Sequence, residues 1–100
     1  MVTAQFDVYR LPDGIQVVDV QSPLASVHAT RLVLPLIAPT DGAAVVQRLN
    51  PLVTLNGEHW LLATHFATTV DARLLRTPVG SLADQEWTIK SALDFLLNGF

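Results

Sequence analysis

The dipeptide Asn56-Gly57 constrains the fold more than any other feature of the sequence, because it stands between two apolar runs. Asn and Gly both accept the positive φ angles of a two-residue turn, and the twist of that turn matches the twist of paired strands. The flanking runs, Pro51–Leu55 and Glu58–Ala63, are therefore predicted to form a β-hairpin. The middle of the chain is thus expected in an antiparallel sheet.

A second hairpin is predicted near the N-terminus. Residues Gln5–Arg10 alternate, with Phe6 and Val8 on one face and the neighbouring residues, Tyr9 among them, on the other. A Leu-Pro-Asp-Gly turn follows, in which Pro presets φ and Gly accepts a positive φ. Ile15–Val20 is the expected returning strand.

Further strands are predicted on both sides of the central hairpin. Arg31–Ile37 is a nearly continuous apolar run, but Pro35 lies inside it. Proline cannot donate to a strand ladder, so an edge position or a bulge is expected there. Thr68–Leu75 is predicted to be another strand, whereas Ala43–Leu49 is compatible with a short helix or with irregular structure.

The end of the sequence predicts a helix. Ser81 and Asp84 have the spacing of a capping box, with an acidic residue where Glu is usual. An apolar stripe at helical spacing, widened by Ala92 and Leu97, consists of Ile89, Leu93, Leu96 and Phe100. We therefore expect a single domain over residues 1–100 that is mainly β, with short antiparallel strands and one C-terminal α-helix.

Composition narrows the functional classes. Half of the residues are hydrophobic and 15% are charged, which is more apolar material than a monomer of this size needs and favours a homodimer. The net charge is -3 and the six Lys and Arg residues are scattered, which argues against direct binding to nucleic acid. There is no cysteine, so disulfides and Cys-based zinc sites are excluded. Without a signal-peptide or membrane-span pattern, a cytoplasmic location is expected.

The polar residues do not form a recognisable catalytic or metal-binding pattern. His59 and His65 have the wrong spacing for one helix face, and with His28 they lack a neighbouring pair of carboxylates. Asp19, Ser22 and His28 can be drawn as a hydrolase triad, but no nucleophile elbow accompanies them. We therefore expect no catalytic residue, no metal and no cofactor.

Taken in order, several segments resemble the CcdB family, the toxins of plasmid and chromosomal toxin–antitoxin pairs. The resemblance runs over nearly the whole chain and is carried by Gln5-Phe6 with Val8-Tyr9, Val18–Ser22, Arg31–Leu36, Leu49–Pro51 with Val53, Gly57–Trp60, Ile89–Leu93 and Gly99. It implies an SH3-like small antiparallel β-barrel with a C-terminal helix, assembled as a homodimer. The implied activity is non-enzymatic: the dimer wedges into the GyrA subunit of DNA gyrase and traps the cleaved-DNA complex. A disordered CcdA-like antitoxin neutralises it by folding over the dimer.

The resemblance also assigns two surfaces. It places gyrase binding at Leu24, Ala25, Asp94, Leu97, Asn98, Gly99 and Phe100. It places antitoxin binding in the first hairpin turn and before the central hairpin, at Leu11, Asp13, Gly14, Asp41, Gly42, Val46 and Asn50. Because the apolar helix stops at a Gly and a large aromatic residue, Gly99 and Phe100, the chain end is expected either to pack into its own core or to contact a partner.

Two alternative functions, and the position of Trp87, stay open. The family helix typically closes in Trp-Gly-Ile, whereas Asn98 replaces the Trp here, and such a loss commonly costs roughly 2 kcal/mol at an interface. The chain is therefore also compatible with a regulatory module that binds antitoxin, and acts in transcription regulation, without poisoning gyrase. A ribonuclease of the MazF type, which shares the SH3-like barrel, would use Arg73 and Arg76. Trp87 is outside the helical stripe and is expected at the barrel mouth or in a dimer interface.

Overall fold

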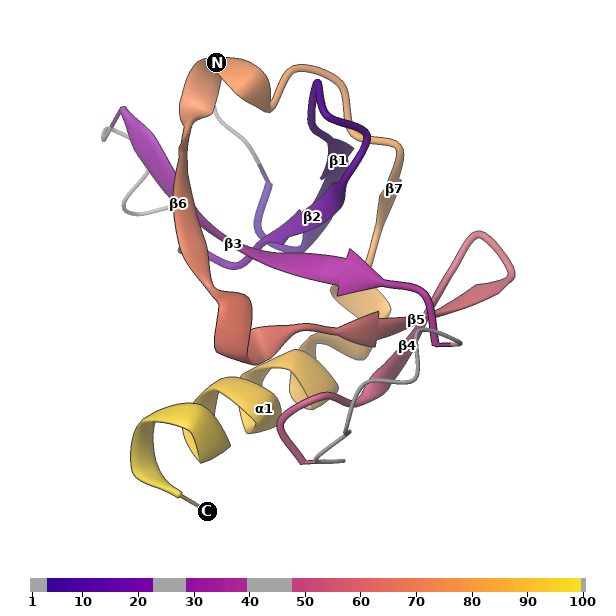
Figure 1. Cartoon of the computed structure of the whole chain (residues 1–100), viewed down its shortest axis with the longest axis vertical. Coiled ribbons are helices and arrows are strands. Elements are labelled where there is room, and N and C mark those ends of the chain that lie inside the picture. Colours follow the sequence, from indigo (N-terminus) through magenta and orange to yellow (C-terminus); the bar gives the residue numbers. More distant parts are fainter. Residues whose placement is uncertain (1–3, 23–28, 40–47, 100) are drawn as a thin grey trace.

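The computed structural model describes residues 4–22, 29–39 and 48–99, and it is mainly β with one C-terminal helix (Figure 1). The strands are β1 (Asp7–Arg10), β2 (Gln16–Asp19), β3 (Thr30–Ile37), β4 (Leu52–Leu55), β5 (Glu58–Leu62), β6 (Thr68–Asp71) and β7 (Gly80–Ser81). Short 3-10 helices are η2 (Thr64–Phe66), η3 (Ala72–Leu74) and η4 (Ala83–Gln85), and the α-helix is α1 (Glu86–Asn98). The order β4-β5-β3-β2-β1-β7, with β6 also on β3, makes a nearly closed antiparallel barrel-like sheet and confirms the predicted fold class.

Both predicted hairpins are present. Val8 pairs with Val18 across β1 and β2, and the turn between these strands contains Gly14 at φ 91°. In the central hairpin, Asn56 and Gly57 have φ angles of 52° and 83°. These are the left-handed values that a type I′ turn needs, so the Asn-Gly signal identified the turn correctly.

Apolar side chains fill both faces of the strands β1, β2 and β3. Phe6, buried despite its φ of 72°, and Val8 belong to the main core, which also receives Ile89 of α1. Tyr9 was predicted on the open face of its strand, but it is only 3% exposed. It lies in a second apolar cluster with Leu75, which follows η3. The simple alternation therefore failed because the segment after β6 covers the second face.

Pro35 lies in a central strand, so the predicted edge position or bulge is wrong. β2 flanks one side of β3, while the other side pairs with β6 up to Val33 and with β5 from Leu36. Pro35 stands where this second partner changes, and its carbonyl accepts the N–H of Ala63 at 2.8 Å. The N and O of one residue point to the same side of an antiparallel strand. The missing proline N–H therefore falls at a break that the ladder already has.

The final helix begins later than predicted. Ser81 ends β7, and its hydroxyl accepts the N–H of Ala83 at 3.1 Å, so Ser81 supports η4 and does not cap α1. The N-cap of α1 is Gln85, which makes no side-chain bond to the helix. Its amide pairs with Thr54 of β4 instead, donating to the carbonyl at 2.7 Å and accepting the N–H at 2.9 Å. The capping-box prediction is wrong. The Ser81 side chain supports the 3-10 turn, and the residue at the N-cap of α1 is Gln85, whose side chain bonds to β4.

The barrel closes where the β4–β5 turn meets the start of β7. The Asn56 side chain donates to the carbonyl of Val79 at 3.1 Å. A Cβ on Gly80 would lie 2.6 Å from a methyl carbon of Leu55, so a larger residue there would require the Leu55 side chain to shift. Side-chain contacts thus complete a closure that the strand ladder leaves open.

Two other segments differ from the prediction or lie outside the described part. The strand expected over Thr68–Leu75 stops at Asp71, because the Asp71 carboxylate accepts the N–H of Arg73 at 2.9 Å and turns the chain into η3. The segment Ala43–Leu49 falls mainly outside the described residues. In the described part of the chain, no helix combines the length and the hydrophobicity needed to cross a membrane.

Candidate functional site

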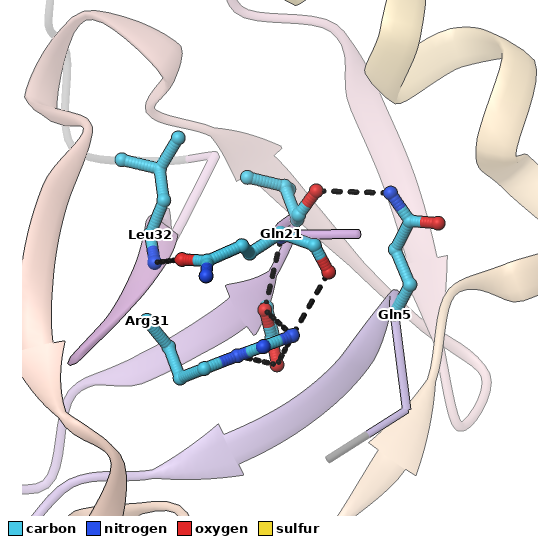
Figure 2. Close-up of polar contacts among 6 residues, drawn as sticks. Gln5, Gln21, Arg31 and Leu32 are labelled. Carbon is cyan, nitrogen blue, oxygen red and sulfur yellow. Dashed lines mark hydrogen bonds and ion pairs between the residues drawn. The ribbon is translucent and has the colours of Figure 1, made fainter. Parts of the chain in front are cut away.

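A buried polar network joins β2 to β3 (Figure 2). Arg31 donates from Nε to one carboxylate oxygen of Asp19 at 3.0 Å and from Nη2 to the other at 3.2 Å. The same Nη2 donates to the carbonyl of Gln21 at 2.9 Å, and the Gln21 side chain accepts the N–H of Leu32 at 2.9 Å. Gln5 donates to the backbone just after β2 at 3.0 Å.

The charges of this network are buried and paired. The Asp19 and Arg31 side chains are 0% and 2% exposed, and a buried charge must be paired to remain ionised. Asp19 is thus committed to a guanidinium, which removes it from the hydrolase triad that can be drawn on the sequence. The network holds the chain just before residues 23–28, which include the proposed gyrase contacts Leu24 and Ala25 and lie outside the described residues.

One face of α1 packs into the core, whereas the last turn of the helix is exposed. Ile89 is 0% exposed, whereas Leu97 is 76% exposed. Asp94 and Asn98 are also exposed on the same turns. The helix ends at Gly99, which adopts φ 77° and donates its N–H to a carbonyl one turn earlier at 2.8 Å. The structure therefore brings Asp94, Leu97, Asn98 and Gly99 together on one exposed helix end, while Phe100 lies outside the described residues.

Other apolar side chains are exposed on α1 and on the turn that packs against it. The η2 turn packs against α1 and carries Phe66, which is 60% exposed. Arg48 stacks over the ring of Phe95 with its guanidinium carbon 4.8 Å from the ring centroid. Leu96, on the same helix, is 40% exposed. Sequence periodicity did not single out Phe66, because nothing in a lone Phe after a strand signals that it stays uncovered.

The proposed antitoxin contacts lie in two separate places. Leu11, Asp13 and Gly14 form the β1–β2 turn, at the end of the molecule away from α1 (Figure 1). Asn50 lies near α1 instead and is only 6% exposed. Its amide donates to the carbonyl of Leu62 at 3.1 Å and bonds to His65 Nδ1 at 3.0 Å. The remaining positions Asp41, Gly42 and Val46 are outside the described residues.

A comparison of the sequence with models of protein families identifies the family of this chain. A model of the CcdB protein family matches residues 5–99. The chain belongs to the CcdB family. A search of curated proteins gave no match. Membership of the CcdB family supports a toxin of the toxin–antitoxin type, and the partners of that family are in general DNA gyrase and the CcdA antitoxin.

Trp87 adds an unexpected feature to this CcdB-family barrel. It lies in the first turn of α1 and is 81% exposed, so it does not plug the barrel mouth. Trp60 of β5, by contrast, packs against the main core. The exposure of Trp87 argues against the position at the barrel mouth, while its place in a dimer interface stays a prediction.

Arg73 and Arg76 do not lie on one strand, as the ribonuclease hypothesis assumed. Arg73 is in η3 and its guanidinium pairs with Asp71 at 2.7 Å, while Arg76 follows the turn. This pairing lowers the pKa of Asp71 to about 2, through hydrogen bonds from the Arg73 side chain and backbone. A carboxylate with so low a pKa is a weak general base. Among the described residues, no three His, Asp, Glu or Cys side chains are grouped as metal ligands.

Proposed function

We propose that this chain is a homodimeric CcdB-type toxin that binds the GyrA subunit of DNA gyrase through the end of α1 and traps the cleaved-DNA complex. The observation that carries the proposal is the exposed last turn of α1, with Leu97 76% exposed on a chain of the CcdB family. A protein–protein interface at that position would remove a large apolar side chain from water.

The arrangement supports a wedge and not a chemical step. The packed first half of α1 holds the exposed second half rigidly, since Ile89 and Ala92 are both 0% exposed. A rigid contact surface loses little conformational entropy on binding. In a two-fold dimer, two such helix ends would match a two-fold target. Binding the cleaved state of gyrase more tightly than the resealed state would then shift gyrase toward cleavage.

Exposed apolar side chains support the dimer. Among the described residues, the large hydrophobic side chains exposed besides that of Leu97 are those of Ile15, Leu52, Phe66, Leu74, Val79, Trp87 and Leu96. Phe66 and Leu96 lie on elements that pack against each other, η2 and α1. A homodimer contact would cover part of this exposed apolar surface.

The decisive experiment is induction of the chain in two strains, one with wild-type gyrase and one with a gyrase allele resistant to CcdB. We expect growth arrest only in the strain with wild-type gyrase. Arrest in both strains would point to another target and would contradict the proposal. Absence of arrest in both, with soluble protein present, would favour the regulatory module that binds antitoxin without poisoning gyrase.

A matched pair of variants tests whether the helix end makes the contact. Leu97→Asp places a charge on the proposed surface, and Thr69→Asp places the same charge at an exposed position of β6, away from the last turn of α1 (Figure 1). With purified gyrase, we expect Leu97→Asp to lower the amount of trapped cleaved DNA at least about tenfold, as for loss of an interface anchor. Thr69→Asp should retain it. Equal loss in both variants would contradict the assignment of the surface.

Asn98 supplies the converse test. The family Trp is absent at this exposed position, and an aromatic anchor commonly contributes roughly 2 kcal/mol. We expect Asn98→Trp to strengthen gyrase binding by about thirtyfold. If the wild-type chain is harmless and Asn98→Trp is toxic, the rest of the gyrase surface is present and the regulatory alternative describes the natural protein.

The proposal also includes a cognate CcdA-like antitoxin that folds over the dimer. Its contacts would be Leu11, Asp13 and Gly14 on the β1–β2 turn, together with the positions before β4. Because the turn is exposed and the Asn50 amide already has two partners, the turn is the stronger candidate for direct contact.

A further inference from the structure

A second concave surface lies at the end of the barrel opposite α1. Residues of β1, of the β1–β2 turn and of η3 with the segment after it enclose a pocket of about 620 Å³. These elements meet at one end of the molecule in Figure 1. The volume is within the range of small-molecule sites in proteins. The pocket borders the proposed antitoxin turn through Pro12, but its charged residues come from β1, β6, η3 and the segment after η3.

The pocket concentrates positive charge. Arg10, Arg73 and Arg76 line it, although the whole chain has only six Lys and Arg residues and a net charge of -3. Of the described residues that line the pocket, Asp71 is the only acidic one. Three guanidinium groups less one carboxylate leave a local charge of +2. The remaining cations are engaged elsewhere: Arg31 and Lys90 in ion pairs and Arg48 on an aromatic ring.

The three guanidinium groups are not equally committed. Arg73 is held by Asp71, which receives its Nε at 3.1 Å and its Nη2 at 2.7 Å, so the outer edge of the guanidinium is left for a ligand. Arg76 donates only to the Arg73 carbonyl at 3.4 Å, a weak contact. Within the described part of the chain, Arg10 and Arg76 have no carboxylate in an ion pair. Asp71 thus orients Arg73 and offsets its charge, whereas no ion pair within the described residues offsets the charges of Arg10 and Arg76.

We propose that this pocket is a binding site for a phosphate group, carried either by a nucleotide or by the backbone of a nucleic acid. Guanidinium groups match phosphate with two parallel hydrogen bonds, which makes clustered arginines the usual phosphate ligands. Thr77 adds a hydroxyl to the same lining. A pocket focuses the field of its charges, so an overall acidic chain still attracts an anion there.

The site binds and does not cleave. A phosphodiester cleavage step needs a general base, and the acidic residue in the described lining is tied to Arg73 with its pKa lowered to about 2. Tyr9, the other titratable side chain of the lining, is 3% exposed and its pKa is raised, mainly by burial. Neither group accepts a proton readily near neutral pH, so the proposal is for recognition without chemistry.

The test measures binding of adenosine 5′-monophosphate and of a 16-nucleotide single-stranded DNA at low salt, by calorimetry and by NMR. We expect binding of at least one of these probes with a dissociation constant of about 1 mM or tighter, and shifts at Arg10, Arg76 and Thr77. Binding of the mononucleotide as tightly as the oligonucleotide identifies a free nucleotide as the source of phosphate. Tighter oligonucleotide binding with a steep salt dependence identifies the nucleic acid backbone.

Two variants with the same change of charge make the test specific. Arg76→Gln removes a pocket guanidinium and should weaken binding about tenfold, whereas Lys90→Gln removes a cation of α1 and should weaken it less than about twofold. Equal weakening by both variants would indicate general attraction to a charged surface and would overturn the site. Absence of binding of both probes would overturn it too, as would equal binding of a poly-glutamate peptide, which would indicate an acidic protein partner.

Discussion

Two Asp–Arg pairs in this molecule have the same chemistry and opposite surroundings. Asp19 and Arg31 are 0% and 2% exposed and bind each other between β2 and β3, whereas Asp71 and Arg73 are 42% and 88% exposed at the mouth of a pocket. The buried pair satisfies charges that could not remain alone in the interior. The exposed pair is screened by water and contributes little to folding, so it is free to orient an arginine toward a ligand.

The comparison extends to α1. Its first half contributes Ile89 and Ala92 to the core, and its second half leaves Leu97 in water. Buried groups of this protein therefore hold the barrel, while chemically similar exposed groups form the surfaces that we assign to partners. Mutations can test that division directly.

The largest effect is expected when one partner of the buried pair is removed. Asp19→Ala leaves the Arg31 charge unpaired in the interior and should lower the free energy of unfolding by about 3–5 kcal/mol. Asp71→Ala is the matched control and should leave the unfolding midpoint nearly unchanged. Urea unfolding measures both. A similar loss in the two variants would show that the exposed pair also holds the fold.

A slightly smaller effect is expected from the same comparison within α1. Ile89→Ala creates a cavity in the main core and should cost about 2–5 kcal/mol of unfolding free energy. Leu97→Ala removes a side chain that touches little of its own chain and should change it by less than about 0.5 kcal/mol. Thermal unfolding followed by circular dichroism distinguishes them. A cost for Leu97→Ala close to that of Ile89→Ala would mean that the helix end is packed in the folded state.

The smallest effect concerns pH. Burial, and then the charge of Asp19, raise the pKa of Asp7 above 3.8. The folded state therefore binds this proton more tightly than the unfolded state, and stability is lost as pH rises from about 3.8 through the folded pKa. Asp7→Asn should remove this loss and raise the melting temperature at pH 7 by about 1–2 °C. The gain should disappear below pH 3.8.

Asp71 shows the opposite sign and serves as the control for that experiment. Its pKa is lowered to about 2 by Arg73, so its contribution is present above pH 3.8 and is lost as pH falls toward 2. Asp71→Asn should therefore leave the melting temperature at pH 7 unchanged or slightly lower. If Asp71→Asn raised the melting temperature at pH 7 as much as Asp7→Asn, the local environments of the two carboxylates would not determine the direction of their effects on stability.

Local signals in the sequence predicted the elements that local physics determines. The Asn56-Gly57 turn requires positive φ at both residues, and the hairpin formed there. The spacing of Ile89 and Leu93 predicted which face of the helix packs. These features depend on residues close together in the chain, so the sequence displays them directly.

Features that depend on distant residues were missed or misassigned. Tyr9 is covered by Leu75, and the side-chain amide of Gln85 forms hydrogen bonds with the backbone of Thr54. Neither the burial of Tyr9 nor the first residue of α1 therefore followed from the local pattern. The scattered arginines argued against binding to nucleic acid, which stays a prediction; that folding brings Arg10 and Arg73 into the lining of one pocket could not be read from their spacing. The exposed helix end was placed by family resemblance, because periodicity alone assigned its apolar residues to the core.

The position of β3 has a consequence for how fast this barrel forms. β3 pairs with β2, β5 and β6, and residues joined in the last pairing, such as Val33 and Thr68, are far apart in sequence. Closing such long loops costs entropy before any contact repays it, which places barrels of this kind among the slow two-state folders, in milliseconds to seconds. The β1–β2 hairpin is complete as soon as its turn closes, whereas β6 must await the chain up to Asp71. During synthesis, the main sheet therefore cannot be finished until most of the chain has left the ribosome.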